Sequence, residues 1–273
     1  MTTIAILLGS GNPNPDPNRS GPSVAIVVND SVYIIDFGPG VVRRAIEAGL
    51  KSEQLNCAFL THLHSDHCAG YPDLILTPAV TGRITALEVH GPRGLRSMTD
   101  HIMSAYEKDI EERLKGLEPA VPEAYAVNVH EIPEKTEGII FQDNNVLVEA
   151  FPVNHGLLDA YGFKFLSHDK TIVVSGDTTP SEVLIEKAKN CDLLFHEVYS
   201  ALALRTRPPE WRKYHSSVHT SSHELAELAS HVKPKTLVLY HQLIWNRTEE
   251  DLLTEVMEGY NGHVVSGNDL DVF

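Results

Sequence analysis

The sequence predicts a mixed α/β protein in which two β-sheets pack face to face and helices cover both outer surfaces, a four-layer αβ/βα sandwich. Strand-like apolar runs alternate with helical stretches along the chain, and the second half repeats the plan of the first. The 273 residues, 42% of them hydrophobic, suffice for one large core, and no linker separates two composition regimes. We therefore expect a single domain, residues 1–273, with two pseudo-repeated halves at about 1–140 and 141–273.

The first half begins with strands and then turns into a helix. A hairpin is expected at Asn29-Asp30, and a glycine- and proline-rich turn follows at 36–40. The expected elements, in order, are strands at 4–8, 24–28 and 32–35, a helix at 41–50, and a short buried strand at 55–60.

The second half follows the same plan with two additions. Strands are expected at 146–151, 161–166 and 171–174, followed by a helix that opens near Pro180 and, later, a helix at about 221–231. Outside the repeat, residues 94–117 are expected to form a helix that packs on the body. Residues 201–218 are expected to form a loop that acts as a lid or substrate wall, with Trp211, Tyr214 and His215 as candidate substrate-binding residues.

Three histidines and a carboxylate lie within six residues, at His62, His64, Asp66 and His67. They follow an apolar run, so they are expected where a strand ends. Four polar side chains would be costly to bury unpaired, but imidazole and carboxylate are good ligands for zinc and related divalent metals. This pattern therefore predicts a metal site.

Three further potential ligands, His155, Asp177 and His241, each follow a strand-like run. Together with the first group they make five histidines and two aspartates. This number is enough for two adjacent metal sites if one carboxylate bridges them, so the sequence predicts a dinuclear centre.

At this point the sequence resembles the metallo-β-lactamase superfamily, whose His-x-His-x-Asp-His motif is matched by residues 62–67. It is most similar to the ribonuclease Z and arylsulfatase-related branch. That similarity rests on the turn Leu8-Gly9-Ser10-Gly11, on Ser175-Gly176-Asp177-Thr178, on Phe195-His196-Glu197 and on His219-Thr220. The resemblance implies the metallo-β-lactamase fold, with the metals at one edge between the two sheets.

The resemblance also implies roles. His62, His64 and His155 would hold one metal, Asp66, His67 and His241 the other, and Asp177 would bridge them. Two divalent ions are expected, zinc first, with manganese or iron as alternatives. They would share a hydroxide as nucleophile, which Asp66 helps to orient. His219 is expected to give a proton to the leaving group, and Glu197 to orient His219 and raise its basicity. A homodimer is expected from the resemblance alone.

Composition and charge limit the binding partners and the cellular compartment that we expect. The formal net charge is −15 with no basic block, which argues against a dedicated nucleic-acid binder. The apolar runs are too short for a membrane span, and no secretory signal is visible after Met1. The three cysteines are odd in number and far apart, which suits a reducing compartment. A cytoplasmic protein is expected if Met1 is the natural start.

The expected activity is hydrolysis of a small anionic ester, a phosphodiester or an aryl sulfate. Many ribonuclease Z enzymes carry a long basic arm that grips tRNA, whereas only Ser167–Lys170 join two predicted strands at the corresponding place here. Nucleic acid is therefore the less favoured substrate. A lactonase or β-lactam hydrolase, a ribonuclease Z-like nuclease and, last, a non-catalytic metal or ligand-binding protein remain the alternatives.

Overall fold

The computed structural model describes residues 2–273 and contains two mixed sheets of six and seven strands, in the orders β1-β2-β3-β4-β5-β6 and β13-β12-β11-β10-β9-β8-β7. The strands of the first sheet are β1 Thr3–Gly9, β2 Ser23–Val28, β3 Ser31–Ile35, β4 Cys57–Phe59, β5 Leu87–Gly91 and β6 Val127–Glu131. Those of the second are β7 Gly138–Gln142, β8 Leu147–Pro152, β9 Tyr161–Leu166, β10 Thr171–Val174, β11 Leu193–Tyr199, β12 Thr236–Leu243 and β13 Val264–Ser266.

The two sheets share one plan. In each, the early strands pair antiparallel through short turns, and the later strands pair parallel through helical crossovers. The change occurs at β3 in the first sheet and at β10 in the second. The first sheet ends at residue 131 and the second begins at residue 138.

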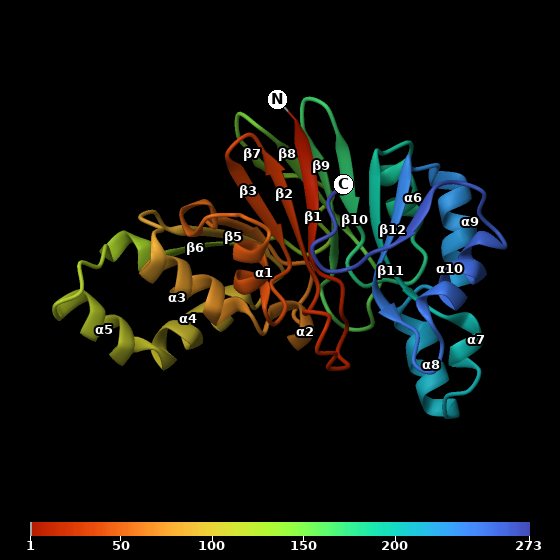
Figure 1. Cartoon of the computed structure of the whole chain (residues 1–273), viewed down its shortest axis with the longest axis horizontal. Helices are drawn as coiled ribbons and strands as arrows, with labels where there is room; N and C mark the ends of the chain where they lie inside the picture. Colours follow the sequence, from red (N-terminus) through yellow and green to blue (C-terminus); the bar gives the residue numbers. More distant parts are fainter. Residues whose placement is uncertain (1) are drawn as a thin grey trace.

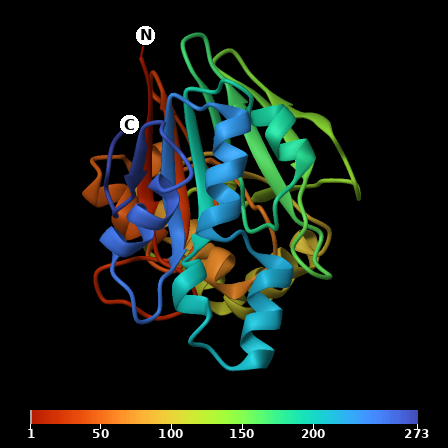
Figure 2. The ribbon, with the colours of Figure 1, turned by 90° about the vertical axis from the view of Figure 1, so that its right-hand side faces the viewer.

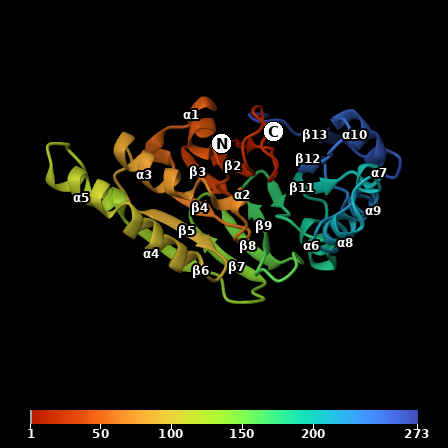
Figure 3. The same ribbon diagram turned by 90° about the horizontal axis from the view of Figure 1, so that it is seen from below.

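Helices cover the outer face of each sheet (Figures 1 and 3). The first sheet carries α1 Val41–Glu47, α3 Tyr71–Thr81 and α4 Leu95–Ala105, and the second carries α6 Glu182–Ala188, α9 Ser222–Val232 and α10 Glu249–Met257. The first half also contains α2 Ser65–Cys68, α5 Glu107–Lys115 and the 3-10 helices Ser52–Gln54 and Pro122–Tyr125. This arrangement confirms the predicted four-layer fold.

Three apolar layers hold the sandwich together. The central one lies between the sheets and includes the rings of Phe59, Phe163 and Phe165, which pack edge to face. Each of the other two lies between one sheet and its helices. Because most strands contact apolar groups on both faces, runs such as Thr3–Gly9 are almost continuously apolar instead of alternating.

Two predicted elements differ from the structure. The expected helix at 94–117 is two helices, α4 and α5, which meet at Tyr106. The expected loop at 201–218 is largely helical, as α7 Ala201–Leu204 and α8 Pro209–Val218. Ser200 caps the first of these helices and Pro209 begins the second, signals that the irregular composition of this segment obscured. Both helices lie at the end of the molecule that also carries α2 (Figures 1 and 2).

Of the helices between residues 2 and 273, none combines the length and the apolar character that crossing a bilayer requires.

Candidate metal centre

Seven side chains meet at the end of the molecule that carries α2, and we call them the ligand cluster: His62, His64, Asp66, His67, His155, Asp177 and His241. They come from four places in the sequence that lie up to about 180 residues apart. All seven were predicted from the sequence, and the structure brings all seven together.

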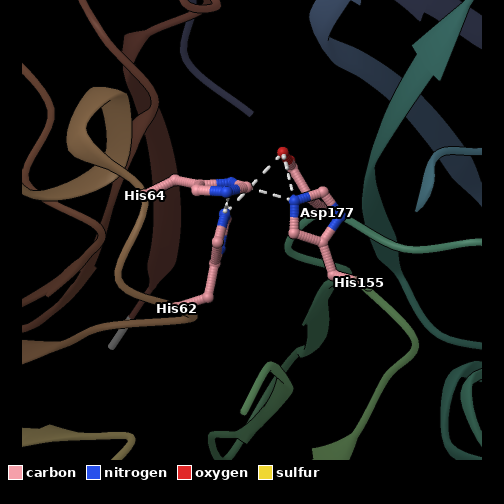
Figure 4. Close-up of side chains that lie close together, drawn as sticks. All are labelled: His62, His64, His155 and Asp177. Atoms are coloured by element: carbon pink, nitrogen blue, oxygen red, sulfur yellow. Dashed lines mark hydrogen bonds and ion pairs between the residues drawn. The ribbon is translucent and has the colours of Figure 1, made fainter. Parts of the chain in front are cut away.

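The first group in the cluster contains three histidines and Asp177 (Figure 4). Nε2 of His62 and Nε2 of His155 lie 3.1 and 3.0 Å from Nδ1 of His64. Oδ2 of Asp177 lies 3.9 Å from the His62 nitrogen and 3.8 Å from the His155 nitrogen. Three ring nitrogens and one carboxylate oxygen therefore converge on one point.

The second group contains Asp66, His67 and His241. Oδ2 of Asp66 lies 3.1 Å from Nε2 of His241 and 3.6 Å from Nε2 of His67. Asp177 joins this group too, because its Oδ1 is 3.4 Å from His67 Nε2 and its Oδ2 is 3.4 Å from His241 Nε2. One carboxylate thus contacts donors of both groups.

His241 reaches the cluster through a β-bulge. Tyr240 pairs with Glu197 and Gln242 pairs with Val198, so His241 is an extra residue within β12. Its φ of 47° is in the left-handed region, which is costly for a residue other than glycine. The sequence placed His241 at the end of a strand; in the structure the bulge turns it toward Asp66 while the strand continues to Leu243.

Asp36 orients a histidine of each group. It is a buried carboxylate in the turn that was predicted at 36–40. Its Oδ2 lies 2.8 Å from Nδ1 of His67 and accepts a 2.9 Å hydrogen bond from the hydroxyl of Thr61. The Thr61 oxygen in turn lies 2.9 Å from Nδ1 of His62. If both Nδ1 atoms carry the proton, both Nε2 lone pairs face the cluster. The available signal was the same as for the ligands, a carboxylate directly after an apolar strand.

The remaining supports are backbone groups. Nδ1 of His155 donates to the carbonyl oxygen of Val218 at 2.7 Å, which leaves Nε2 free to face the cluster. Gly176, with a φ of 61°, precedes Asp177, and a side chain there would press against Thr61 and the Tyr161 carbonyl.

His219 and Glu197 form a pair beside the cluster. Nδ1 of His219 lies 3.4 Å from Oε2 of Glu197 and 3.9 Å from Oδ2 of Asp177. The other oxygen of Glu197 accepts hydrogen bonds from the amides of Thr220 and Thr178, at 2.8 and 3.3 Å. These two amides belong to the neighbours of His219 and Asp177, so Glu197 fixes the pair relative to the cluster.

The cluster fits divalent ions in chemistry and in spacing. Around a tetrahedral ion with bonds of about 2.0–2.1 Å, neighbouring ligand atoms lie about 3.3 Å apart, and the separations given above run from 3.0 to 3.9 Å. Among residues 2–273, Oδ1 of Asp177 and Nε2 of His67 are buried without a hydrogen-bond partner. Such atoms are expensive to bury unless a cation joins them.

Comparison with known proteins agrees with this geometry. A family model described as a β-lactamase superfamily domain matches residues 32–242. The chain belongs to the metallo-β-lactamase superfamily. A protein named ribonuclease Z from Mycobacterium marinum is 31% identical over 273 residues, which cover 97% of this chain and 95% of the relative. The predicted resemblance is therefore confirmed.

Solved structures share the fold. The metallo-β-lactamase fold protein YhfI from Bacillus subtilis superposes with a TM-score of 0.76 at 18% identity, over 100% of both chains. The short form of human tRNase Z superposes with a TM-score of 0.74 at 22% identity, over 99% of this chain and 98% of that one. The superfamily is one of metal-dependent hydrolases, and its fold implies divalent metals at the cluster.

Charges differ between the two groups of the cluster. Burial lowers the pKa of His62 well below its usual range and lowers that of His155. Burial acts in the same direction on His67 and His241 and is the largest single effect. The carboxylates of Asp177 and Asp36 around His67, and of Asp177 and Asp66 around His241, together outweigh it and raise the pKa of each ring. The imidazoles of the first group are therefore ready ligands, whereas a cation entering the second group must displace protons.

Burial also sets the charge of the pair beside the cluster. It lowers the pKa of His219 to about 4, although the Asp177 carboxylate opposes this shift. It raises the pKa of Glu197 well above its usual range, and the charge of Asp177 adds to that effect. Both shifts arise mainly from burial of the two groups. The expected role of Glu197 in raising the basicity of His219 stays a prediction.

The expected substrate wall lies beside the cluster, although as helices instead of a loop. A cavity of about 670 Å³ opens there, and it is lined by His64, Asp66, Asp177 and His219 on one side and by Trp211, Tyr214 and His215 of α8 on the other. Arg207 and Glu210, which belong to the segment predicted as the wall, also line the cavity, as do Pro13, Asn14 and Leu243. Trp245 lines it too and was not predicted. Trp245 follows β12, so nothing in the sequence connects it with α8.

Two residues near the cluster in sequence stay outside it. His196 is fully buried, and its Nδ1 lies 2.6 Å from the carbonyl oxygen of Glu197. Cys68 ends α2, and its thiol contacts the carbonyl oxygen of His64 at 3.1 Å. Burial raises the pKa of this thiol to about 11, so it is a poor metal ligand.

Proposed function

We propose that this protein is a two-metal phosphodiesterase of the ribonuclease Z type, which hydrolyses a phosphodiester bond in RNA. The observation that carries the proposal is Asp177, whose oxygens lie within 3.4–3.9 Å of histidines from both groups of the cluster. The relative named ribonuclease Z favours RNA over the small ester that the sequence alone ranked first.

The chain's own residues divide into ligands for two ions. His62, His64 and His155 would hold one, Asp66, His67 and His241 the other, and Asp177 both. Zinc suits such nitrogen and oxygen donors, with manganese or iron as alternatives. Two divalent ions in such a site activate water and neutralise the charge that develops on the phosphoryl oxygens.

The protein would position the other reacting groups. Asp66 belongs to the ligand cluster and also lines the cavity, so it can orient the attacking water. Nδ1 of His219 lies 3.4 Å from Oε2 of Glu197 and 3.9 Å from Oδ2 of Asp177, so the ring is held beside the cluster, where it can give a proton to a leaving oxygen. Glu197, fixed by two amides, would act by positioning His219.

A panel of substrates tests the proposal. Metal-loaded protein is assayed on precursor tRNA with a 3′ trailer, an unstructured RNA, bis-p-nitrophenyl phosphate, p-nitrophenyl sulfate, a lactone and a cephalosporin. We expect turnover of RNA and of the phosphate diester. Turnover of the lactone or the cephalosporin alone would replace the proposal by the acyl-transfer alternative, and turnover of the sulfate alone by an arylsulfatase.

A second candidate is hydrolysis of a small phosphodiester. In its favour, β9 and β10 are joined only by Ser167–Lys170, which leaves no tRNA-binding arm at this place, and the net charge is −15. Against it, the alignment with the M. marinum relative covers 95% of that protein, so a long insertion does not distinguish the two chains. Efficient cleavage of the diester with no cleavage of any RNA would favour this candidate.

A further inference from the structure

One side of the active-site cavity is an aromatic surface. It is formed by Trp211, Tyr214 and His215 of α8 and by Trp245, and we call it the aromatic wall. Trp211 and Tyr214 are 46% and 42% exposed, and their ring centroids lie 5.9 Å apart, so they form one exposed patch instead of scattered rings. Trp245 adopts a left-handed φ of 46°, so its backbone is held in a costly conformation beside the site.

The rings of the wall continue into the ligand cluster. Trp211, His215 and His219 are four residues apart, so they share one face of α8 and its C-cap. Successive ring centroids from Trp211 to His215, His219 and His241 lie 5.7, 5.6 and 5.7 Å apart, with interplanar angles of 25°, 31° and 24°. A column of rings, each inclined by 24–31° to the next, therefore runs from the exposed Trp211 to a candidate metal ligand.

Arg207 adds a positive charge at the same wall. Its guanidinium carbon lies 5.6 Å from the centroid of the Trp245 ring. Across residues 2–273 no carboxylate comes within ion-pair distance of Arg207, and its buried Nε has no partner. The segment 201–218 also carries Arg205, Arg212 and Lys213 against the single carboxylate of Glu210, in a chain of net charge −15. The unpaired cation thus faces the cavity where an anionic substrate would enter.

We propose that the aromatic wall is a nucleotide subsite, in which a base next to the scissile phosphate stacks on Trp211 and Arg207 contacts an adjacent phosphate. This inference rests on the proposed function and names its substrate class, a single-stranded ribonucleotide segment. Exposed rings combined with an unpaired arginine are the usual means of binding such strands. An aryl ester would use the rings but leave Arg207 without a second anion, so the nucleotide fits better.

Two substrates with the same leaving group isolate the base. Thymidine 5′-(p-nitrophenyl phosphate) and methyl p-nitrophenyl phosphate differ only in the group that stays on phosphorus. We expect the native protein to favour the nucleoside substrate by roughly 5- to 100-fold in kcat/KM, the range typical of one stacked base. Trp211→Ala should bring this ratio close to one, and Trp211→Phe should restore most of it.

Tyr106→Ala is the matched control, because Tyr106 is 41% exposed and lies between α4 and α5, away from the cavity. Its ratio should match the native one. A native ratio near one, or a ratio that Trp211→Ala leaves unchanged, would overturn the inference while leaving the phosphodiesterase in place. An equal preference for bis-p-nitrophenyl phosphate would assign the wall to aryl rings instead.

A binding measurement tests the nucleotide subsite even if neither substrate is hydrolysed. Lack of hydrolysis would by itself refute the proposed function but not the subsite. We expect adenosine 5′-monophosphate to bind more tightly than ribose 5-phosphate by roughly 5- to 100-fold, and Trp211→Ala to abolish the difference. Equal affinities would overturn the inference.

The proposed contact between Arg207 and a phosphate is tested separately, by the salt dependence of RNA binding. The slope of log Kd against log salt concentration for a short single-stranded RNA should fall by about 0.7 in Arg207→Gln, because one phosphate contact is lost. Arg205→Gln removes an exposed charge two residues away, outside the cavity lining, and should leave the slope unchanged. Equal slopes in the native protein and Arg207→Gln would refute the phosphate contact.

Discussion

The ligand cluster and the aromatic wall face the same cavity but are built in opposite ways. Most of the cluster is buried, and only His64 and Asp66 are partly exposed. Its residues follow β4, β8 and β10 or lie in α2 and β12, and Asp36, Thr61 and Val218 fix three of its rings by hydrogen bonds. The wall is more open and is built mostly on α8: Trp211 and Tyr214 are exposed, whereas His215 is buried and Trp245 lies in the turn after β12. Its rings contact one another, with His215 between the two indoles.

This difference in construction indicates that the cluster and the wall have different functions. A reacting centre needs donors held within a fraction of an ångström, which buried strand ends and hydrogen bonds provide. A surface that accepts different bases needs flat, adaptable contacts instead. Changes in the cluster should therefore abolish chemistry, whereas changes in the wall should alter the choice of substrate.

The largest effect is expected for Asp177→Ala. Because both groups of the cluster lose a ligand, elemental analysis should show at most one metal per chain instead of two. Activity on bis-p-nitrophenyl phosphate should fall by about 10³-fold or more. Asp100→Ala, which removes an exposed carboxylate of α4, should change neither. Full metal content and activity in Asp177→Ala would contradict the bridging role.

His219→Ala should be nearly as damaging, but selectively so. His219 is the C-cap of α8 and lies beside the cluster. A proton donor matters most when the leaving group is poor, so the loss of activity should depend on the substrate. We expect losses of about 10²- to 10⁴-fold on a dinucleotide and much smaller losses on a p-nitrophenyl diester, with both metals retained. Glu197→Gln should show the same pattern in weaker form. Equal losses on both substrates would mean that His219 only positions the substrate.

Asp36→Asn should weaken metal binding at both sites. Loss of such a supporting carboxylate typically reduces metal affinity by about 10- to 100-fold, which competition with a chelator can measure. Thr61→Val breaks only the link to His62, so it should affect one of the two sites. If Thr61→Val were as harmful as Asp36→Asn at both sites, the proposed relay through Thr61 would be wrong.

Glu255→Gln should disturb the wall but not the cluster. The buried carboxylate accepts hydrogen bonds from the hydroxyls of Ser200 and Ser222, both at 2.6 Å, and so ties down both ends of the α7–α8 segment. An amide leaves one donor unsatisfied, at a cost of about 1–3 kcal/mol in unfolding free energy, measurable with urea. Metal content should stay at the native level. A parallel loss of metal would show that wall and cluster are not independent, and exposed Glu250→Gln is the control.

The smallest effect concerns His215 and pH. Burial lowers the pKa of His215 in the folded protein to about 4, below its usual value of 6.5. Its contribution to stability is therefore complete above pH 6.5 and is lost as the pH falls through 4. Between pH 7 and 5.5 the native protein should lose about 1 kcal/mol more unfolding free energy than His215→Phe, which keeps a ring in the column. Equal losses in the two proteins would show that His215 does not titrate in this window.

The sequence by itself determined the layers of the fold and the identity of every residue in the ligand cluster. Both follow from local signals. Apolar runs of strand length predicted the sheets. Polar side chains directly after those runs are expensive to bury unpaired, so they predicted a metal that binds them. His62, His155 and Asp177 could be recognised without knowing which strands are neighbours.

Only the tertiary structure decided how these residues are held and what lies opposite them. Asp36 and His67 are 31 residues apart, and Trp211 and Trp245 are 34 apart, so no periodicity connects the members of either pair. The bulge at His241 leaves the apolar pattern of β12 intact, which is why it was invisible in the sequence. Local patterns fix which face of an element is buried, but contacts between distant elements depend on how the layers pack, and packing is a property of the whole chain.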